Sequence, residues 1–356
     1  MLAGVLVLVA LAVPAWFIGS HCFSVRSRPA ERSAELQRVT ADVKGYFRSE
    51  SSTYLTLPEW YIVYSADEYA SFVQSRAPSR FPYSAAVGQY WRYYKQVCRA
   101  TKRVYPFDAG NHLMLGVLGM SFSMENLVKG GYENTVGALS ESIGFYHTAE
   151  DVFARKTAQE YAEFIHATPW YEFPFAGKLK RLWTQTPLWG PDLVRKWERR
   201  FVLSAEYTAK AAYAWLIRLG TRSVYQPEDL VIHAWLDDAP ERIFEDDRIR
   251  KVKTLGPRSS IVALPRYAAF TSVVTALAKQ GVRFHDLAGN DEILLTAIVP
   301  RELVLHPAAG GIVLSEEILT NPATKRIAVR VPVRTLHVIL TDLPTRGASV
   351  EHLYDY

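Results

Sequence analysis

The hydrophobic and polar positions divide the chain into three regions with different patterns. Residues 1–19 hold no ionisable side chain, residues 50–225 carry apolar positions at helical spacing, and after about residue 228 short β-rich runs alternate with turn signals. Apolar residues at i, i+3, i+4 and i+7 indicate amphipathic helices, whereas short runs of β-branched residues between turn residues indicate strands. The pattern therefore predicts an α+β fold in which a helical part precedes a mixed part.

The first region is long enough to cross a membrane. A transmembrane helix needs about 20 mostly apolar residues, and Leu2–Phe23 meets this length. Basic residues follow this stretch and do not precede it: Arg26, Arg28, Arg32, Arg38 and Lys44. Because positive charge favours the cytoplasmic side, we expect a single-pass membrane anchor over residues 1–24 and a large cytoplasmic domain. A cleaved signal peptide ending near Ala15 is the alternative, and it would make the mature protein secreted or periplasmic.

The second region reads as a charged helical stalk over residues 25–50 and an aromatic-rich α-helical domain over residues 51–227. Helical patterns cover Leu57–Gln74, Ser84–Lys102 and Asp192–Gly220. Thr148 and Asp151 have the spacing of a capping box, in which two side chains satisfy free backbone N–H groups at a helix start. No second stretch in this region reaches transmembrane length.

The third region, residues 228–356, contains an internal repeat with an offset of 66 residues. Two sets of apolar positions correspond, Phe270, Val273, Val274 and Leu277 in one copy and Leu336, Ile339, Leu340 and Leu343 in the other. Both sets follow the stripe of an amphipathic helix, and each helix is followed by a glycine, Gly281 or Gly347, and a strand. Two β-α-β units sharing one sheet predict a ferredoxin-like βαββαβ domain.

Composition excludes several classes of protein. A formal net charge of +5 without a dense run of Lys or Arg gives no basis for nucleic-acid binding. The two cysteines, Cys22 and Cys98, suggest neither a disulfide framework nor a metal-binding spacing. The chain has 9 Trp, 20 Tyr and 16 Phe, mostly before residue 230. These side chains suit a large helical core or an aromatic-lined pocket.

Motifs of nucleotide binding and hydrolysis are absent from the sequence. No stretch has the form of a phosphate-binding loop, a GxSxG elbow or an HExxH helix, so we expect no cofactor. Glu163 and His166 form one E-x-x-H, a spacing used by di-iron helical bundles. Such a site also needs a second E-x-x-H, which the helical part lacks. Glu163 and His166 therefore stay an incomplete metal-site hypothesis.

Three glutamates are candidate functional acids. Glu59 stands between Pro58 and Trp60, and Glu172 lies in the aromatic run PWYEFPF. Burial beside aromatic rings would raise the pKa of either carboxyl and suit it to acid–base chemistry. An ordinary ion pair is the competing interpretation, for Glu172 with Lys178 or Arg181.

The third candidate, Glu133, lies in SMENLVKGGYENTVGALSE, where Glu125, Glu133 and Glu141 recur at steps of eight. Such a step turns successive side chains by about 80° around a helix, so the three do not share a face. Lys129 is four residues from both Glu125 and Glu133 and is predicted to pair with them. The glycine pair at 130 and 131 is expected to allow a bend or a close backbone approach.

These patterns support two functional hypotheses. The first is a bitopic membrane-anchored protein, of a type common in bacteria, whose cytoplasmic part binds a protein partner or a small apolar ligand without catalysis. The alternative is a membrane-associated enzyme that acts on an apolar or lipid-like substrate in an aromatic-lined helical pocket. The absence of a complete catalytic motif favours the first.

Overall fold

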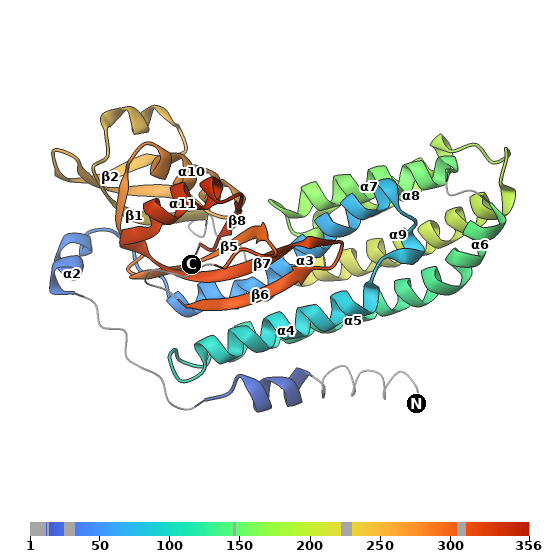
Figure 1. Ribbon diagram of the computed structural model, residues 1–356, viewed down its shortest axis with the longest axis horizontal. Coiled ribbons are helices and arrows are strands. Elements are labelled where there is room, and N and C mark those ends of the chain that lie inside the picture. Colours follow the sequence, from blue (N-terminus) through green and yellow to red (C-terminus); the bar gives the residue numbers. More distant parts are fainter. Residues whose placement is uncertain are drawn as a thin grey trace. The chain divides into compact units, whose positions relative to one another are not determined.

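The chain forms two compact units in the computed structural model, which describes residues 12, 14–24, 33–144, 147–221, 230–304 and 311–355 (Figure 1). One unit comprises Met1–Glu59, Tyr90–Met120 and Gln226–Tyr356 and holds the β-sheets. The other, the helical unit, comprises Trp60–Gln89 and Ser121–Tyr225. Three of the four boundaries fall inside the long helices α3, α4 and α5, so each of these helices contributes residues to both units.

Helices dominate the chain up to residue 221, as the apolar spacing predicts. They are α2 (Ala34–Thr40), α3 (Glu50–Ser75), α4 (Tyr83–Thr101), α5 (Ala109–Tyr132), α6 (Ala138–Ile143), α7 (Ala149–Ile165), α8 (Phe175–Gln185) and α9 (Leu193–Thr221). A π-helical turn, Glu133–Gly137, joins α5 to α6. The predicted capping box is present, because the Thr148 hydroxyl accepts from the Asp151 N–H and the Asp151 carboxylate accepts from the Thr148 N–H.

Two four-stranded antiparallel sheets follow. The first consists of β1 (Val231–Asp237), β2 (Arg250–Gly256), β3 (Ser259–Pro265) and β4 (Arg283–Leu287), and the second of β5 (Glu292–Pro300), β6 (Ile312–Ile318), β7 (Asn321–Pro332) and β8 (Ser349–Leu353). The strand orders are β2-β3-β1-β4 and β6-β7-β5-β8. The second order becomes the first when each strand number is lowered by four, so both copies have the same topology.

The predicted ferredoxin-like fold is therefore wrong, although the α+β content is as expected. In each copy the strands before and after the helix flank a third strand: β1 lies between β3 and β4, and β5 lies between β7 and β8. Each copy thus completes a sheet of its own from a β-β-β-α-β unit. The sequence pattern hid this because the edge strand β2 (RKVKTLG) is charged and largely exposed, as edge strands often are.

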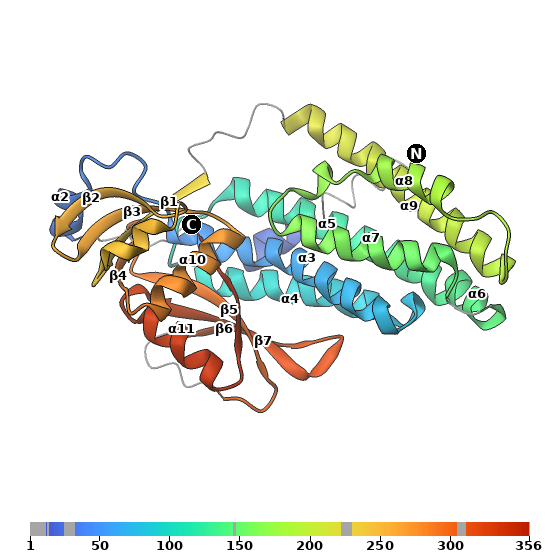
Figure 2. The same cartoon turned by 90° about the horizontal axis from the view of Figure 1, so that it is seen from above.

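The two copies share one hydrophobic core. Helices α10 (Ala268–Lys279) and α11 (Leu336–Thr345) pack against each other (Figure 2). Phe270 and Val273 of α10 are buried in the same cluster as Leu336 and Leu340 of α11. The α10 helix also contacts β8 of the second copy, and α11 contacts β4 of the first. Each helix therefore covers a strand of the other copy.

The described part of the predicted membrane segment packs on the protein. Residues 14–21 are helical, and the Phe17 ring lies 4.9 Å from the Trp91 ring and 5.0 Å from the Tyr94 ring of α4, measured between centroids. A Cβ at Gly116 of α5 would lie 2.9 Å from the Pro14 Cβ, so this glycine permits the close approach. Cys22 is bonded to Cys98 of α4, a disulfide that the sequence analysis did not expect.

The prediction of a single-pass membrane anchor is wrong on this evidence. Residues 1–11 and 13 of the anchor, and residues 25–32 of the stalk, lie outside the described residues. Among those that the structure describes, no helix combines the length and the apolar character that a membrane crossing needs. The membrane partner and the localisation inferred from that anchor lose their basis. A disulfide is also typical of proteins in oxidising compartments, whereas the sequence analysis predicted a cytoplasmic domain.

The helix α9 has an unusual distribution of polarity. Its exposed large side chains are apolar: Leu193, Val194, Trp197, Phe201, Tyr213, Trp215, Leu216 and Leu219. Its charged residues Arg195, Lys196, Arg199 and Arg200 are buried instead. These four charges of α9 therefore lie in the interior of the helical unit, whereas the Arg218 side chain near the end of the helix is 41% exposed.

Candidate functional site

A cavity of about 110 Å³ opens within the helical unit, between residues of α3, α4, α5, α7, α8 and α9. Its aromatic lining includes Tyr69, Tyr83, Phe122, Tyr161, Phe175 and Tyr207. Four charged side chains, Glu125, Lys129, Glu206 and Lys210, also line it. The cavity thus combines an apolar wall with a compact polar region.

The four charged side chains form a connected set. The Lys210 Nζ lies 2.9 Å from a Glu206 oxygen and 2.7 Å from a Glu125 oxygen. The Lys129 Nζ lies 3.5 Å from Glu206 and 4.3 Å from the centre of the Tyr69 ring, a cation–π distance. Glu206 therefore bridges two ammonium groups, and the two acids balance the two bases.

These pairs keep the groups charged. Burial alone would raise the pKa of Glu206, but the two lysines outweigh it and lower this pKa to about 2. Burial alone would lower the pKa of Lys129 and of Lys210; the neighbouring carboxylates, chiefly Glu206 for Lys129 and Glu125 for Lys210, raise both above the ordinary value. Near neutral pH the three groups consequently hold fixed charges.

Local sequence explains how the cavity is built. Glu206 and Lys210 are four residues apart on α9, so they share one helix face. Helix α5 continues without a break through the glycine pair at 130 and 131. A Cβ at Gly130 would lie 2.7 Å from the Tyr83 Cβ, so Gly130 allows the ring of Tyr83 to approach the cavity. Gly130 thus provides the close approach, whereas no atom lies within 4 Å of a Cβ added at Gly131.

Glu133 is buried next to this cavity, at the start of the π-helical turn. Its two oxygens accept hydrogen bonds from Arg199 Nη1 at 2.8 Å and Nη2 at 3.0 Å. This bidentate arrangement is among the stronger charged contacts in proteins. The predicted pairing of Lys129 with Glu125 and Glu133 is replaced by contacts to α9.

We expect Gly137→Ala to lower the free energy of unfolding by about 1–3 kcal/mol, the usual cost of overpacking. A Cβ at position 137 would lie 2.5 Å from the Glu133 Oε2, and the carboxylate would have to leave Arg199. Urea denaturation of both proteins measures the difference.

Gly131→Ala on the same helical run is the matched control, because no atom lies within 4 Å of a Cβ added there. It should be neutral, or stabilising by up to about 1 kcal/mol, since alanine is the better helix former. Equal stability of the two variants would contradict the constraint on Glu133.

A second set of buried charges lies at the start of α7 and α9. Glu150 accepts from Lys196 Nζ at 2.8 Å and from Arg200 Nη2 at 2.5 Å. Arg195 Nη2 donates to Asp151 at 2.8 Å. These side chains are almost fully buried and paired with one another, which is the arrangement that buried charges require.

The other candidate acids are exposed. Glu172 lies 3.7 Å from Arg218, so it pairs with neither Lys178 nor Arg181. The surrounding protein, with a further contribution from Asp355, raises the pKa of Glu59, but the Glu59 side chain is open to solvent. Solvent screens the charge of this carboxylate, so Glu59 is not a buried acid. Glu133 and Glu172 belong to separate ion pairs.

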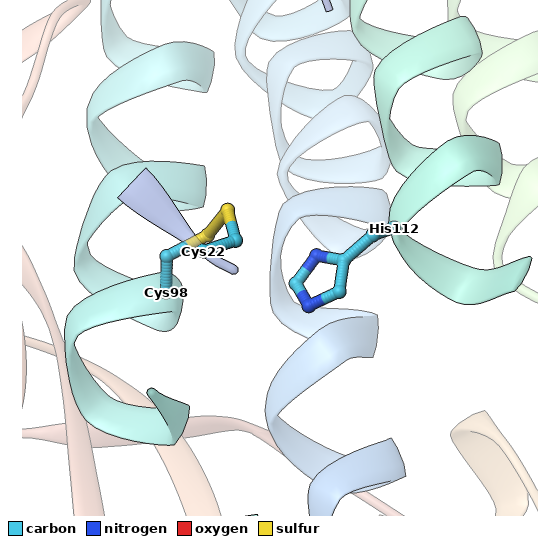
Figure 3. A group of neighbouring side chains, drawn as sticks. All are labelled: Cys22, Cys98 and His112. Atoms are coloured by element: carbon cyan, nitrogen blue, oxygen red, sulfur yellow. A yellow bond between two sulfur atoms is a disulfide. The ribbon is translucent and has the colours of Figure 1, made fainter. Parts of the chain in front are cut away.

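Among the residues that the structure describes, Glu163 and His166 belong to no group of three metal-ligating side chains. Glu163 is exposed and accepts from Gln159 at 3.4 Å. The His166 Nε2 lies 2.9 Å from the Asp67 carboxylate. Within the described ranges, the one convergent group of three metal-ligating side chains is a different one, namely Cys22, Cys98 and His112 (Figure 3).

Comparisons with known proteins add no functional information. No protein-family model matches the chain, no curated protein matches it, and no solved structure matches it.

Proposed function

We propose that the helical unit is a non-catalytic binding module for a small, uncharged ligand with a flat apolar body. The observation that carries the proposal is the cavity in which aromatic rings surround the Glu206 bridge between two lysines. Cavities between packed helices are frequent ligand sites.

The volume limits the size of the ligand. An apolar cavity of about 150 Å³ holds one benzene molecule, and this cavity measures about 110 Å³. This cavity is smaller than that one, so one small ring, or a short chain of similar bulk, is the upper limit for a ligand. Long lipid chains exceed them, which disfavours the lipid-like substrate of the alternative hypothesis.

The charges limit the polarity of the ligand. Two carboxylates and two ammonium groups line the cavity and cancel each other. A charged ligand would leave one net charge in a partly desolvated space, which is unfavourable. An uncharged ligand with one hydroxyl or amide can hydrogen-bond to these groups without disturbing the balance.

The fixed charges favour binding over acid–base catalysis. General acids and bases work best when their pKa lies near the working pH. The pKa of Glu206 is lowered to about 2, and the pKa values of Lys129 and Lys210 are raised. None of these three groups is therefore prepared to exchange a proton near neutral pH.

Binding of benzyl alcohol tests this proposal. We expect saturable binding near a millimolar Kd, since small ligands gain a few tenths of a kcal/mol per heavy atom, or roughly 4 kcal/mol here. Benzoate and benzylammonium have similar size but carry charge, and both should bind at least about tenfold more weakly. Ligand-observed NMR with the purified full chain measures all three.

A cavity-filling variant assigns the site. Ala158→Phe on α7 fills the cavity, because Ala158 lines it, and should abolish benzyl alcohol binding. Gln159→Phe is the control, because Gln159 is the next residue on α7 and is exposed. If Ala158→Phe binds as the unmodified protein does, or if the three probes bind equally, the proposal is wrong.

A further inference from the structure

We propose that Cys22, Cys98 and His112 form a redox-gated zinc site. In the oxidised chain the two sulfurs are bonded to each other and the site is closed. After reduction, the two thiolates and the imidazole bind one Zn²⁺. This site is independent of the ligand cavity of the helical unit.

The three side chains come from separate segments and meet in the interior. Cys22 follows the N-terminal helical segment, Cys98 lies near the end of α4, and His112 lies in the first turn of α5. All three are buried. One possible ligand atom from each lies within 4.8 Å of the others, and Figure 3 shows the imidazole ring beside the disulfide.

Coordination of tetrahedral zinc requires these side chains to rearrange after reduction. Zn–S and Zn–N bonds of about 2.3 and 2.0 Å place neighbouring ligand atoms roughly 3.5–3.8 Å apart. In the oxidised chain the sulfurs are bonded to each other, and all three ligand atoms lie within 4.8 Å of one another, so the sulfurs must move apart for the imidazole and both thiolates to share one ion. Two cysteines and one histidine, with water as the fourth ligand, are an established zinc coordination set.

The imidazole is held in place by its neighbours. The Phe107 ring stacks on it with a centroid distance of 4.8 Å. The Tyr94 hydroxyl lies 3.0 Å from His112 Nδ1 and 3.0 Å from the His112 carbonyl oxygen. Such outer contacts orient a histidine before a metal binds and improve its affinity.

A dithiol is the reductant that opens the disulfide. The dithiol transfers two electrons and two protons to the Cys22–Cys98 bond, which becomes two thiols while the dithiol becomes a disulfide. Binding of Zn²⁺ then displaces one proton from each thiol into solvent, and the metal itself is not reduced.

The oxidised state and the zinc-bound state both link residue 22 to α4. The disulfide joins residue 22 to α4, and a zinc ion would join residue 22, α4 and α5. The N-terminal helical segment would therefore stay attached to the protein when the disulfide is opened, provided that zinc is present.

Zinc content of the oxidised and reduced full chain tests the proposal. Each form is equilibrated with Zn²⁺ and desalted, and bound zinc and free thiols are counted. We expect one zinc per reduced chain, none per oxidised chain, and release of two protons per zinc bound. Cobalt in place of zinc should give a thiolate-to-metal charge-transfer band.

Histidine variants separate this site from binding to thiols alone. His112→Ala should still form the disulfide, but its reduced form should bind zinc at least about tenfold more weakly, the usual loss when a ligand sphere is impaired. His166→Ala, which alters a histidine that contacts Asp67, should bind as the unmodified protein does.

Three results would overturn the proposal: no zinc in the reduced chain, equal zinc affinity in His112→Ala, or zinc uptake only with loss of the circular-dichroism signal of the folded chain. The last result would identify thiols of an unfolded chain as the ligands. The circular-dichroism signal alone distinguishes such binding from binding at the folded site, so no variant is needed.

Discussion

Replacing Glu150 by glutamine is expected to lower the free energy of unfolding by about 3–5 kcal/mol, the cost of breaking a buried ion pair by removing one partner. Glu150 is the shared acceptor of Lys196 and Arg200, and all three side chains are buried. The neutral amide would leave two cations without a counter-charge in the interior. Urea denaturation followed by circular dichroism measures this loss.

Two further variants control this experiment. Glu163→Gln on the same helix removes an exposed carboxylate and should change stability by less than about 0.5 kcal/mol. Adding Lys196→Met to Glu150→Gln removes one of the stranded cations and should restore part of the loss. A change below about 1 kcal/mol for Glu150→Gln, against the 3–5 expected for a buried pair, would show that the cations do not need this acid.

The second prediction with a large expected effect is that the free energy of unfolding falls as the pH rises from about 4 to above 6. The Asp286 carboxyl is buried, and burial raises its pKa from 3.8 to about 6, with a further contribution from Asp291. Hydrogen bonds from the Tyr46 hydroxyl at 2.7 Å and the Gly289 N–H at 2.8 Å, and the charge of His285, offset this only in part.

The direction of the effect follows from proton binding. Between pH 3.8 and about 6 the folded state holds a proton on Asp286 that the unfolded state has released, so the folded state loses stability as pH rises. A shift of about two pH units corresponds to about 3 kcal/mol.

Asp286→Asn isolates this contribution. The amide does not ionise and can still accept from Tyr46, so the variant should gain about 3 kcal/mol relative to the unmodified protein between pH 4 and pH 7. Denaturant titrations of both proteins at several pH values measure the difference. A difference that does not vary with pH would show that Asp286 ionises normally in the folded chain.

Much of the secondary structure can be predicted from the sequence. The apolar spacing of Phe270, Val273 and Val274 locates α10, and the same spacing 66 residues later locates α11. Thr148 and Asp151 mark the start of α7. The sheet topology could not be predicted from the sequence, because it depends on which strands pair. The charged edge strand β2 also lacks the apolar alternation that would indicate a fourth strand.

The candidate site was less predictable. Sequence spacing relates Glu206 to Lys210, but Lys129 reaches Glu206 across 77 positions of the chain, and no local pattern encodes such a contact. Helix α9 adds a second difficulty, since charged residues usually mark an exposed face and here they mark the interior. Glu133 is buried, and its pairing with Arg199 of α9 follows only from the packing.

The N-terminal stretch illustrates the same limit. A run of apolar side chains is compatible with a lipid environment and with packing against protein. Phe17 lies against aromatic rings of α4, and Cys22 is bonded to Cys98. Hydropathy alone does not distinguish these two environments.

The crossed packing of α10 and α11 bears on how the sheet-bearing part unfolds. Because α10 contacts β8 and α11 contacts β4, neither half of the duplication closes its own core. Each helix also contacts strands of its own copy, α10 with β3 and α11 with β7 and β8, so the two halves share both helices in one core. The two halves are therefore expected to unfold as one cooperative unit, since removing either copy would expose the core residues of the other.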